Sequence, residues 1–177
     1  MNAVCVYCGS SFGSDPVYLQ ATRELAATLA ARGIRVVYGG ASVGLMGAQA
    51  DATLDAGGEV VGVIPQQLVD REIAHAGLTE LRVVQTMHQR KALMAELSDA
   101  FVALPGGIGT LEELIEAFTW EQLGLHAKPL ALLNTVGYYD GLAAFLDHAV
   151  EQGFHQPQQR AKLLMADDAE DLLAKWA

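Results

Sequence analysis

The sequence predicts an α/β protein with a Rossmann-like, three-layer, doubly wound parallel sheet, formed as a single domain over residues 1–177. Three observations lead to this expectation. Short apolar, β-branched runs alternate with helical patterns along the whole chain, as in βαβ units. Runs such as VVGVI and LALLN are continuously apolar, which is typical of strands buried on both faces. Glycines gather where these runs end, at the sheet edge where ligands bind.

The expected elements follow one another with short connections. Strands are expected where apolar and β-branched residues run together, at 3–8, 34–38, 59–64, 81–85, 100–104, 129–133 and a weaker 162–165. Helices are expected where apolar residues recur at helical spacing, at 16–32, 44–56, 87–98, 110–122, 139–152 and 168–176. We find no linker, internal repeat or low-complexity segment between them, so one domain is expected.

Composition narrows the classes of partner. The 177 residues are 51% hydrophobic, which suits one globular core. The net charge of −10 repels polyanions, so neither a nucleic acid nor an anionic membrane is an expected partner. No apolar run approaches the roughly 20 residues that span a bilayer, and no basic leader is recognisable. We therefore expect a cytoplasmic protein.

The two cysteines, Cys5 and Cys8, form a C-x-x-C in the first expected strand. At this spacing, strand side chains point to opposite faces and cannot share one metal ion. A redox C-x-x-C would instead lie at a helix N-terminus. We expect both cysteines to serve packing, and we expect no metal site.

Glycine-rich turns follow three of the expected strands, around residues 9–13, 39–47 and 106–109. None fits the G-x-G-x-x-G of dinucleotide sites or the G-K-[ST] of a P-loop. Three such turns at one edge of a sheet favour a smaller nucleotide as the ligand. The alternative is that glycine serves only to reach positive φ, and it stays open for the first turn in particular.

The third turn lies in residues 104–113, LPGGIGTLEE, between a strand and a helix. Free N–H groups and the positive end of the helix dipole bind phosphate at such a turn. Thr110 and Glu113 also fit a T-x-x-E capping box, which is the structural alternative. That alternative leaves Glu112, Glu116 and the glycines unexplained. Carboxylates beside an anion site require cations nearby.

Residues 86–97, TMHQRKALMAEL, contain the only adjacent pair of basic residues, Arg90-Lys91. Arg90 lies within the apolar stripe of the expected helix, so its guanidinium must either snorkel to water or meet a buried anion. Lys91 lies beside the stripe, where simple solvation is the alternative. Because this helix opens onto the same edge as the glycine turns, we expect Arg90 and Glu113 to face one another across a cleft. The stripe consists of Met87, Leu93, Met94 and Leu97.

A carboxylate opposite an arginine, beside a phosphate-type turn, suits cleavage at a sugar carbon. N-glycosidic bonds break through an oxocarbenium-like transition state, which a carboxylate stabilises while it orients or deprotonates water. Arginine remains protonated, so it acts as an electrostatic clamp rather than a proton shuttle. We therefore expect the turn to bind a 5′-phosphate and the glutamates to act on the ribose.

Several segments closely resemble the LONELY GUY family, over nearly the whole chain and in the same order. They are CGSS at 8–11, YGGASVGLMG at 38–47, MHQRK at 87–91, PGGIGTLEE at 105–113, TWEQLG.H.KPLALLN at 119–134 and GYYDGL at 137–142. The family comprises cytokinin riboside 5′-monophosphate phosphoribohydrolases, long mislabelled as lysine decarboxylases. The resemblance implies an N6-substituted adenine as leaving base, no metal or organic cofactor, and homodimers with active sites at the subunit interface.

The resemblance also assigns roles by position. Arg90 and Glu113 match the catalytic pair of the family. Ile108 replaces a tyrosine common in plant members, which bears on the preference for the base. Substrate contacts are expected from Gly9, Ser10, Gly40, Glu72, Met87, Lys91, Gly106, Gly107, Ile108, Gly109, Thr110, Leu111, Glu112, Glu116 and Thr119.

Two other functions remain open at this point. One is a housekeeping AMP or purine nucleotide nucleosidase, which differs only in the base. The other is a non-catalytic nucleotide or molybdenum-cofactor carrier, although storage alone requires no carboxylate at the ribose. Amino-acid decarboxylation is disfavoured, because pyridoxal phosphate needs a Schiff-base lysine and only Lys91 lies near the expected site.

Overall fold

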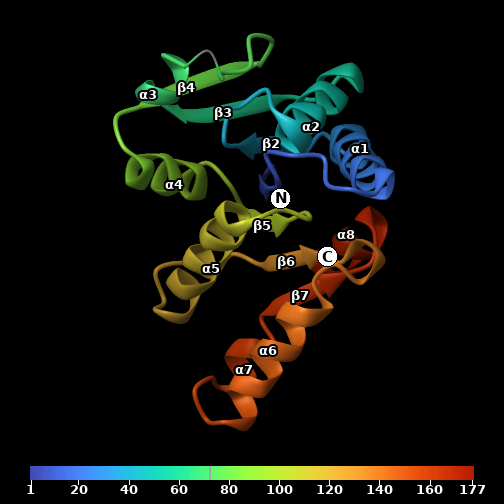
Figure 1. Ribbon diagram of the computed structural model, residues 1–177, viewed down its shortest axis with the longest axis vertical. Coiled ribbons are helices and arrows are strands. Elements are labelled where there is room, and N and C mark those ends of the chain that lie inside the picture. The colour runs from blue at the N-terminus through green and yellow to red at the C-terminus, as the bar shows by residue number, and fades with distance from the viewer. Residues whose placement is uncertain (72) are drawn as a thin grey trace.

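A computed structural model describes residues 1–71 and 73–177. Seven strands form one sheet in the order β4-β3-β2-β1-β5-β6-β7, and each adjacent pair is parallel (Figure 1). This confirms the predicted doubly wound α/β sheet. The strands are β1 (Ala3–Tyr7), β2 (Arg35–Tyr38), β3 (Val60–Pro65), β4 (Glu80–Val84), β5 (Ala100–Ala103), β6 (Leu130–Leu133) and β7 (Leu163–Ala166).

The six predicted helices are present, with ends shifted by at most two residues. They are α1 (Pro16–Ala31), α2 (Gly44–Asp55), α4 (Met87–Glu96), α5 (Ile108–Gln122), α6 (Asp140–Glu151) and α8 (Ala169–Trp176). Three short segments were not predicted, because a single turn is too short for apolar periodicity to register. These are α3 (Gln66–Val69), the 3₁₀ turn η1 (Thr135–Gly137) and α7 (Pro157–Arg160).

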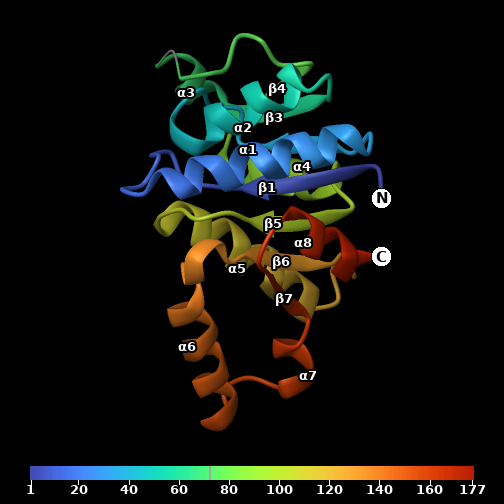
Figure 2. The same ribbon diagram turned by 90° about the vertical axis from the view of Figure 1, so that its right-hand side faces the viewer.

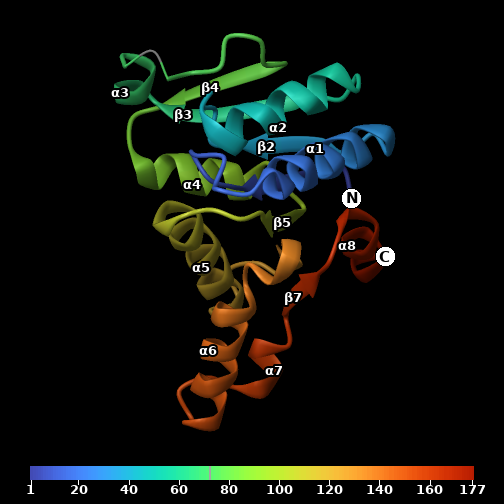
Figure 3. The same ribbon diagram turned by 45° about the vertical axis from the view of Figure 1, so that its right-hand side comes forward.

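Two apolar cores lie on the two faces of the sheet. Leu25 of α1 and Leu172 of α8 belong to one core, whereas Met94 of α4 and Leu114 of α5 belong to the other. Figure 1 shows α1, α2 and α8 on one side of the sheet and α4 and α5 on the other. Figures 2 and 3 show α6 and α7 extending away from the sheet beyond β6 and β7.

The cysteines lie as predicted. Cys5 is fully buried in the core under α4 and α5, whereas Cys8, just past β1, is buried in the opposite core. Both are free thiols, and burial raises the pKa of each well above its ordinary value. Both thiols therefore remain protonated, which agrees with a packing role.

The strand order reverses next to β1. The chain passes from β1 outward through β2 and β3 to β4, and then returns to place β5 on the other side of β1. In parallel sheets such a switch point leaves a crevice outside the carboxyl ends of the two central strands. The turns that follow β1 and β5, residues 8–13 and 104–107, therefore lie together at this crevice.

Candidate active site

The three glycine-rich turns meet at the switch point. The Gly9 N–H donates to the Pro105 carbonyl (3.1 Å), and the Met46 N–H donates to the Gly9 carbonyl (3.3 Å). Close approach explains two of the glycines. A Cβ on Gly106 would overlap the Thr110 hydroxyl, and a Cβ on Gly44 would overlap the backbone of Ser10. The turns thus pack backbone against backbone, which only glycine permits.

The N-terminus of α5 does not have the capping box that Thr110 and Glu113 could have formed. The helix begins at Ile108 with Gly107 as its N-cap, and no side chain caps it. Thr110 and Glu113 lie inside the helix, so they do not form the box. In the described part of the chain no acceptor meets the N–H groups of Ile108, Gly109 and Thr110. A helix start with free N–H groups binds an anion.

Positive φ does not explain this turn either. Gly13 and Gly40 adopt left-handed backbone, with φ of 76° and 75°, whereas Gly107 has φ of −90°. A Cβ would meet nothing within 4 Å at Gly107 or Gly109. These two glycines leave open space beside the free N–H groups, where a ligand can approach the backbone closely.

A cleft of about 270 Å³ opens at the start of α5. Its walls come from the turn after β1, from α2, from α4 and from α5. Seven of the fifteen residues predicted to contact substrate line it, together with the predicted catalytic pair Arg90 and Glu113. The cleft is lined by Cys8, Ser10, Met46, Met87, Arg90, Gly107, Ile108, Gly109, Thr110, Glu112 and Glu113.

Arg90 does not snorkel to water. Its side chain is 9% exposed, its Nε donates to the Val63 carbonyl (3.1 Å) and its Nη2 donates to the Gly39 carbonyl (2.9 Å). Val63 lies within β3, near its carboxyl end, and Gly39 directly follows β2. A Cβ on Gly39 would overlap Nη2, so this glycine makes room for the guanidinium. The sheet edge therefore fixes the orientation of Arg90.

The remaining guanidinium nitrogen, Nη1, points toward Glu113. Nη1 lies 3.6 Å from Glu113 Oε1, so the two groups face one another as expected. Burial raises the pKa of Glu113 above its ordinary value, although the Arg90 charge acts to lower it. Glu112 and Glu116 raise this pKa further, and Lys91 lowers it. Glu113 is therefore a carboxyl group, 14% exposed, on whose pKa burial and the neighbouring charges act in opposite directions.

Lys91 is not a solvated surface lysine. Its side chain is 8% exposed, and its Nζ pairs with Glu112 and with Glu116 (3.0 Å to Oε2). Burial acts to lower the pKa of Lys91, but the hydrogen bonds that its ammonium group donates to the two carboxylates outweigh it, and the pKa lies above its ordinary value. Lys91 is therefore a protonated cation that holds α4 against α5 and neutralises two of the carboxylates near the start of α5.

Seven of the predicted contact residues that the structure describes do not line this cleft: Gly9, Gly40, Lys91, Gly106, Leu111, Glu116 and Thr119. Gly9 and Gly106 border a neighbouring cavity, and Lys91 and Glu116 form the ion pair described above. Gly40 does not line it, and its positive φ and contact with Ile64 account for the glycine. Leu111 packs against the core under α5. Thr119 lies on the exposed surface of α5, where its hydroxyl donates to the Ile115 carbonyl (2.7 Å). Glu72 falls outside the described residues.

Sequence reasoning missed two features of the site. The capping box of this region is at α4, where Thr86 Oγ1 accepts from the Gln89 N–H (3.1 Å) and Gln89 Oε1 accepts from the Thr86 N–H (3.2 Å). The pattern T-x-x-Q was the available signal. The cleft also includes Cys8 and Met46, whose positions depend on how the turns pack and not on a local pattern.

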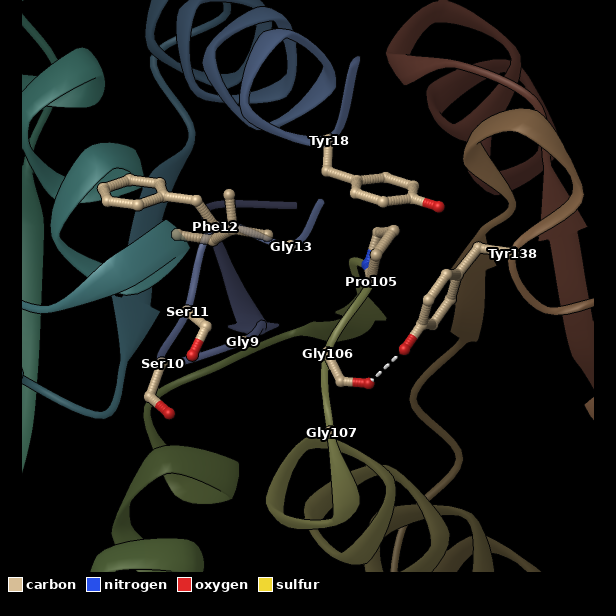
Figure 4. Close-up of a pocket in the computed structure, with 11 residues that line it drawn as sticks. Gly9, Ser10, Ser11, Phe12, Gly13, Tyr18, Pro105, Gly106, Gly107 and Tyr138 are labelled. Atoms are coloured by element: carbon tan, nitrogen blue, oxygen red, sulfur yellow. Dashed lines mark hydrogen bonds between the residues drawn. The ribbon is translucent and has the colours of Figure 1, made fainter. Parts of the chain in front are cut away.

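A second cavity of about 270 Å³ adjoins the cleft on the other side of the turn after β5 (Figure 4). The two spaces share Ser10 and Gly107. The outer wall of the second cavity is aromatic, with Phe12, Tyr18 and Tyr138 around it. Gly106 and Gly107 therefore form a thin partition, in which Gly107 borders both spaces and Gly106 borders the second cavity.

The fold and the site together define a class of protein. A Rossmann-like parallel sheet carries at its switch point an uncapped helix N-terminus, glycine turns and a buried arginine–glutamate pair. This is the arrangement of an anion-binding, nucleotide-type cleft. Residues 46–176 match a family model described as "Possible lysine decarboxylase", and the chain belongs to this family.

Two relatives of similar sequence are named for one hydrolase activity. A probable cytokinin riboside 5′-monophosphate phosphoribohydrolase of Oryza sativa subsp. japonica is 53% identical over 97% of this chain and 81% of that protein. A cytokinin riboside 5′-monophosphate phosphoribohydrolase of Arabidopsis thaliana is 51% identical over 97% of this chain and 81% of its own length.

A solved structure shows the same fold. The molybdenum cofactor binding protein of Rippkaea orientalis superposes with a TM-score of 0.74 over 99% of this chain and 94% of that one. Its sequence is 19% identical, so this likeness concerns the fold alone. Within the described residues, no helix is long and apolar enough to cross a membrane.

Proposed function

We propose that this protein hydrolyses the N-glycosidic bond of N6-substituted adenosine 5′-monophosphates, releasing the free base and ribose 5-phosphate. The observation that carries the proposal is the pairing of Glu113 with Arg90 in the cleft that opens at the uncapped start of α5. The names of relatives that are 51% to 53% identical support the same substrate.

The parts of the cleft suit the steps of this reaction. The free N–H groups at the start of α5 receive the 5′-phosphate, while the Ser10 turn closes the other side. The ribose then lies over Glu113, whose carboxylate stabilises the positive charge that develops at C1′ and orients the attacking water. The bond to the base breaks with its electron pair passing to the base. Water adds to C1′ and gives up a proton to the Glu113 carboxylate, and the departing base takes up one proton, so the products are the neutral base and ribose 5-phosphate.

Arg90 serves this reaction as a fixed cation. Because the carbonyls of Gly39 and Val63 hold two of its nitrogens, only Nη1 is directed toward Glu113. A guanidinium so placed donates to the substrate or holds the carboxylate in its reactive orientation, and it carries no proton between groups. Such an arrangement needs no reorganisation as charge develops, which is the condition for electrostatic catalysis.

Direct measurement of base release tests the proposal. The protein is incubated with N6-isopentenyladenosine 5′-monophosphate and, separately, with AMP, and free base and ribose 5-phosphate are quantified by chromatography. We expect release from the isopentenyl nucleotide with the higher kcat/KM, since the exposed apolar side chains of Met87 and Ile108 line the cleft. A higher kcat/KM for AMP would instead indicate a housekeeping nucleosidase. Release from neither nucleotide would exclude both activities.

The carrier alternative predicts a different outcome. A carrier binds its ligand and returns it unaltered, and it gains nothing from a carboxylate beside an arginine at the sugar.

Amino-acid decarboxylation is disfavoured by the protonation of Lys91. A Schiff base requires a neutral amine, whereas the Lys91 amine is paired with two carboxylates and has a raised pKa.

We also propose that the protein is a homodimer with active sites at the subunit interface. Thr119, predicted to contact substrate, is exposed on α5, and large apolar side chains are exposed on or near α5 and α6. Light scattering coupled to size-exclusion chromatography should give about twice the chain mass of 18.8 kDa. A monomer mass at micromolar concentration would contradict the dimer. These apolar side chains are Ile115, Leu123, Leu125, Phe145 and Phe154.

A further inference from the structure

Three consecutive carbonyls lead from β5 into α5, and each accepts a hydrogen bond from outside the turn. The Tyr139 hydroxyl donates to Leu104 O (2.6 Å), the Gly9 N–H donates to Pro105 O (3.1 Å), and the Tyr138 hydroxyl donates to Gly106 O (2.5 Å). Figure 4 shows the bond from Tyr138 across the outer side of the partition. The sequence reasoning assigned neither tyrosine a role.

The two tyrosines come from a tightly built connection between β6 and α6. Asn134 Oδ1 accepts from the Tyr139 N–H (2.7 Å), and Asn134 Nδ2 donates to Asp140 Oδ1 (2.8 Å). Val136 within this connection has φ of 46°, a left-handed conformation that is unfavourable for a β-branched residue. Such a conformation persists only where surrounding contacts impose it, and it is concentrated at functional sites.

Peptide geometry links Tyr138 to the cleft. The carbonyl of Gly106 and the N–H of Gly107 belong to one trans peptide group and point in opposite directions. Tyr138 lines the second cavity and not the cleft, so it holds the carbonyl on the outer side. The N–H of Gly107 is thereby turned toward the cleft side, next to the free N–H groups of Ile108 and Gly109.

Packing alone does not secure this orientation. On the inner side, Gly106 is wedged against Thr110 and Gly9, but a Cβ added to Gly107 would meet no other atom within 4 Å. The carbonyl of Gly107 accepts from the Leu111 N–H (3.2 Å), but Gly107 is exposed and has no side chain, so no Cβ limits rotation of the peptide plane that precedes it. The hydrogen bond from Tyr138 to the Gly106 carbonyl therefore adds a restriction on rotation of this peptide plane.

We propose that Tyr138 is a positioning residue for the phosphate of the substrate. Its phenol holds the Gly106–Gly107 peptide so that the Gly107 N–H joins the anion-binding N–H groups at the start of α5. This inference rests on the proposed function, because it names the 5′-phosphate as the group that is held. It assigns to Tyr138 a share of the preference for nucleotides over nucleosides.

The variant Tyr138→Phe tests this role. It removes only the hydroxyl of a side chain that is 43% exposed, so the fold should persist, with a thermal midpoint within about 4 °C of wild type. Loss of one hydrogen bond that orders an anion site should weaken binding of inorganic phosphate about three- to tenfold, measured by thermal-shift titration. KM for N6-isopentenyladenosine 5′-monophosphate should rise by a similar factor, while kcat and the kcat/KM for the unphosphorylated riboside stay near wild type.

Tyr18→Phe is the matched control. Tyr18 borders the same cavity and packs edge-on against Tyr138, with ring centroids 5.6 Å apart. Its hydroxyl has no hydrogen-bond partner within residues 1–71 and 73–177. Removing this hydroxyl should leave phosphate affinity and both kinetic constants unchanged.

Each result decides between positioning and a structural role. Selective loss of phosphate affinity in Tyr138→Phe, absent from Tyr18→Phe, supports the inference. Unchanged phosphate affinity, an equal loss for nucleotide and riboside, or no phosphate binding by the wild-type protein would overturn it. If the wild-type protein binds phosphate but releases no base, the proposed function fails, and the phosphate titration still judges the role of Tyr138.

Discussion

Glu113→Gln should lower kcat on the order of 10²-fold or more, while KM for the nucleotide stays within a few-fold of wild type. The amide keeps the size of the side chain but carries no negative charge at C1′ and accepts no proton from water. Because the start of α5 still offers its N–H groups, the phosphate should still bind. Initial-rate measurement of base release from N6-isopentenyladenosine 5′-monophosphate gives both constants.

The stability of Glu113→Gln separates a catalytic carboxylate from a structural one. Burial raises the pKa of Glu113 above its ordinary value of 4.5, so the folded state disfavours the charged form. The contribution of this group to stability is therefore complete below pH 4.5 and is lost as the pH rises through the folded-state pKa. Glu113→Gln should equal or exceed wild-type stability at pH 7, and the difference should vanish below pH 4.5.

Glu96→Gln provides the control for this prediction, since Glu96 lies at the exposed end of α4. It should leave both rate and stability unchanged. A wild-type kcat in Glu113→Gln would show that Glu113 has a purely structural role. A sharp fall in its thermal midpoint at pH 7 would point the same way.

Arg90→Ala should abolish detectable base release and also destabilise the protein at pH 7. The apolar stripe on its own predicts stabilisation, because an unpaired buried charge would be removed. The hydrogen bonds reverse this expectation. The truncation leaves the carbonyls of Gly39 and Val63 without their donor and Glu113 without its cation, at a cost of about 2–4 kcal/mol. Denaturant unfolding at pH 7 measures this difference.

Two further variants separate charge from geometry at Arg90. Arg90→Lys keeps the positive charge, but one ammonium group cannot bond both carbonyls and face Glu113 together, so activity should stay low. Arg90→Ala combined with Glu113→Gln should be less destabilised than the sum of the single changes, because no uncompensated carboxylate remains. Full activity in Arg90→Lys, or strict additivity of the two changes, would show that the pair is not coupled.

The fold was predictable from the sequence because its signals are local. Continuous apolar strands such as 60–65 indicate burial on both faces, and helical periodicity between them indicates covering helices. The helix starts were less certain. Thr110 and Glu113 fit a capping box as well as an active-site pattern, and only the start of α5 at Ile108 decides against the box. One-turn segments such as α3 carried no signal at all.

Within the cleft, the sequence by itself determined the types of group present: the glycine turn after β5, the arginine of α4 and the glutamates of α5. Tertiary structure alone decided what surrounds them. Arg90 bonds to carbonyls 27 and 51 residues away, and Tyr138 bonds to a carbonyl 32 residues away. Such partners are set by the order of strands in the sheet, which brings the ends of β2, β3 and β5 to one edge. The spacing of residues within a strand does not predict that order. Hydrogen bonds across the sheet depend instead on which strands become neighbours.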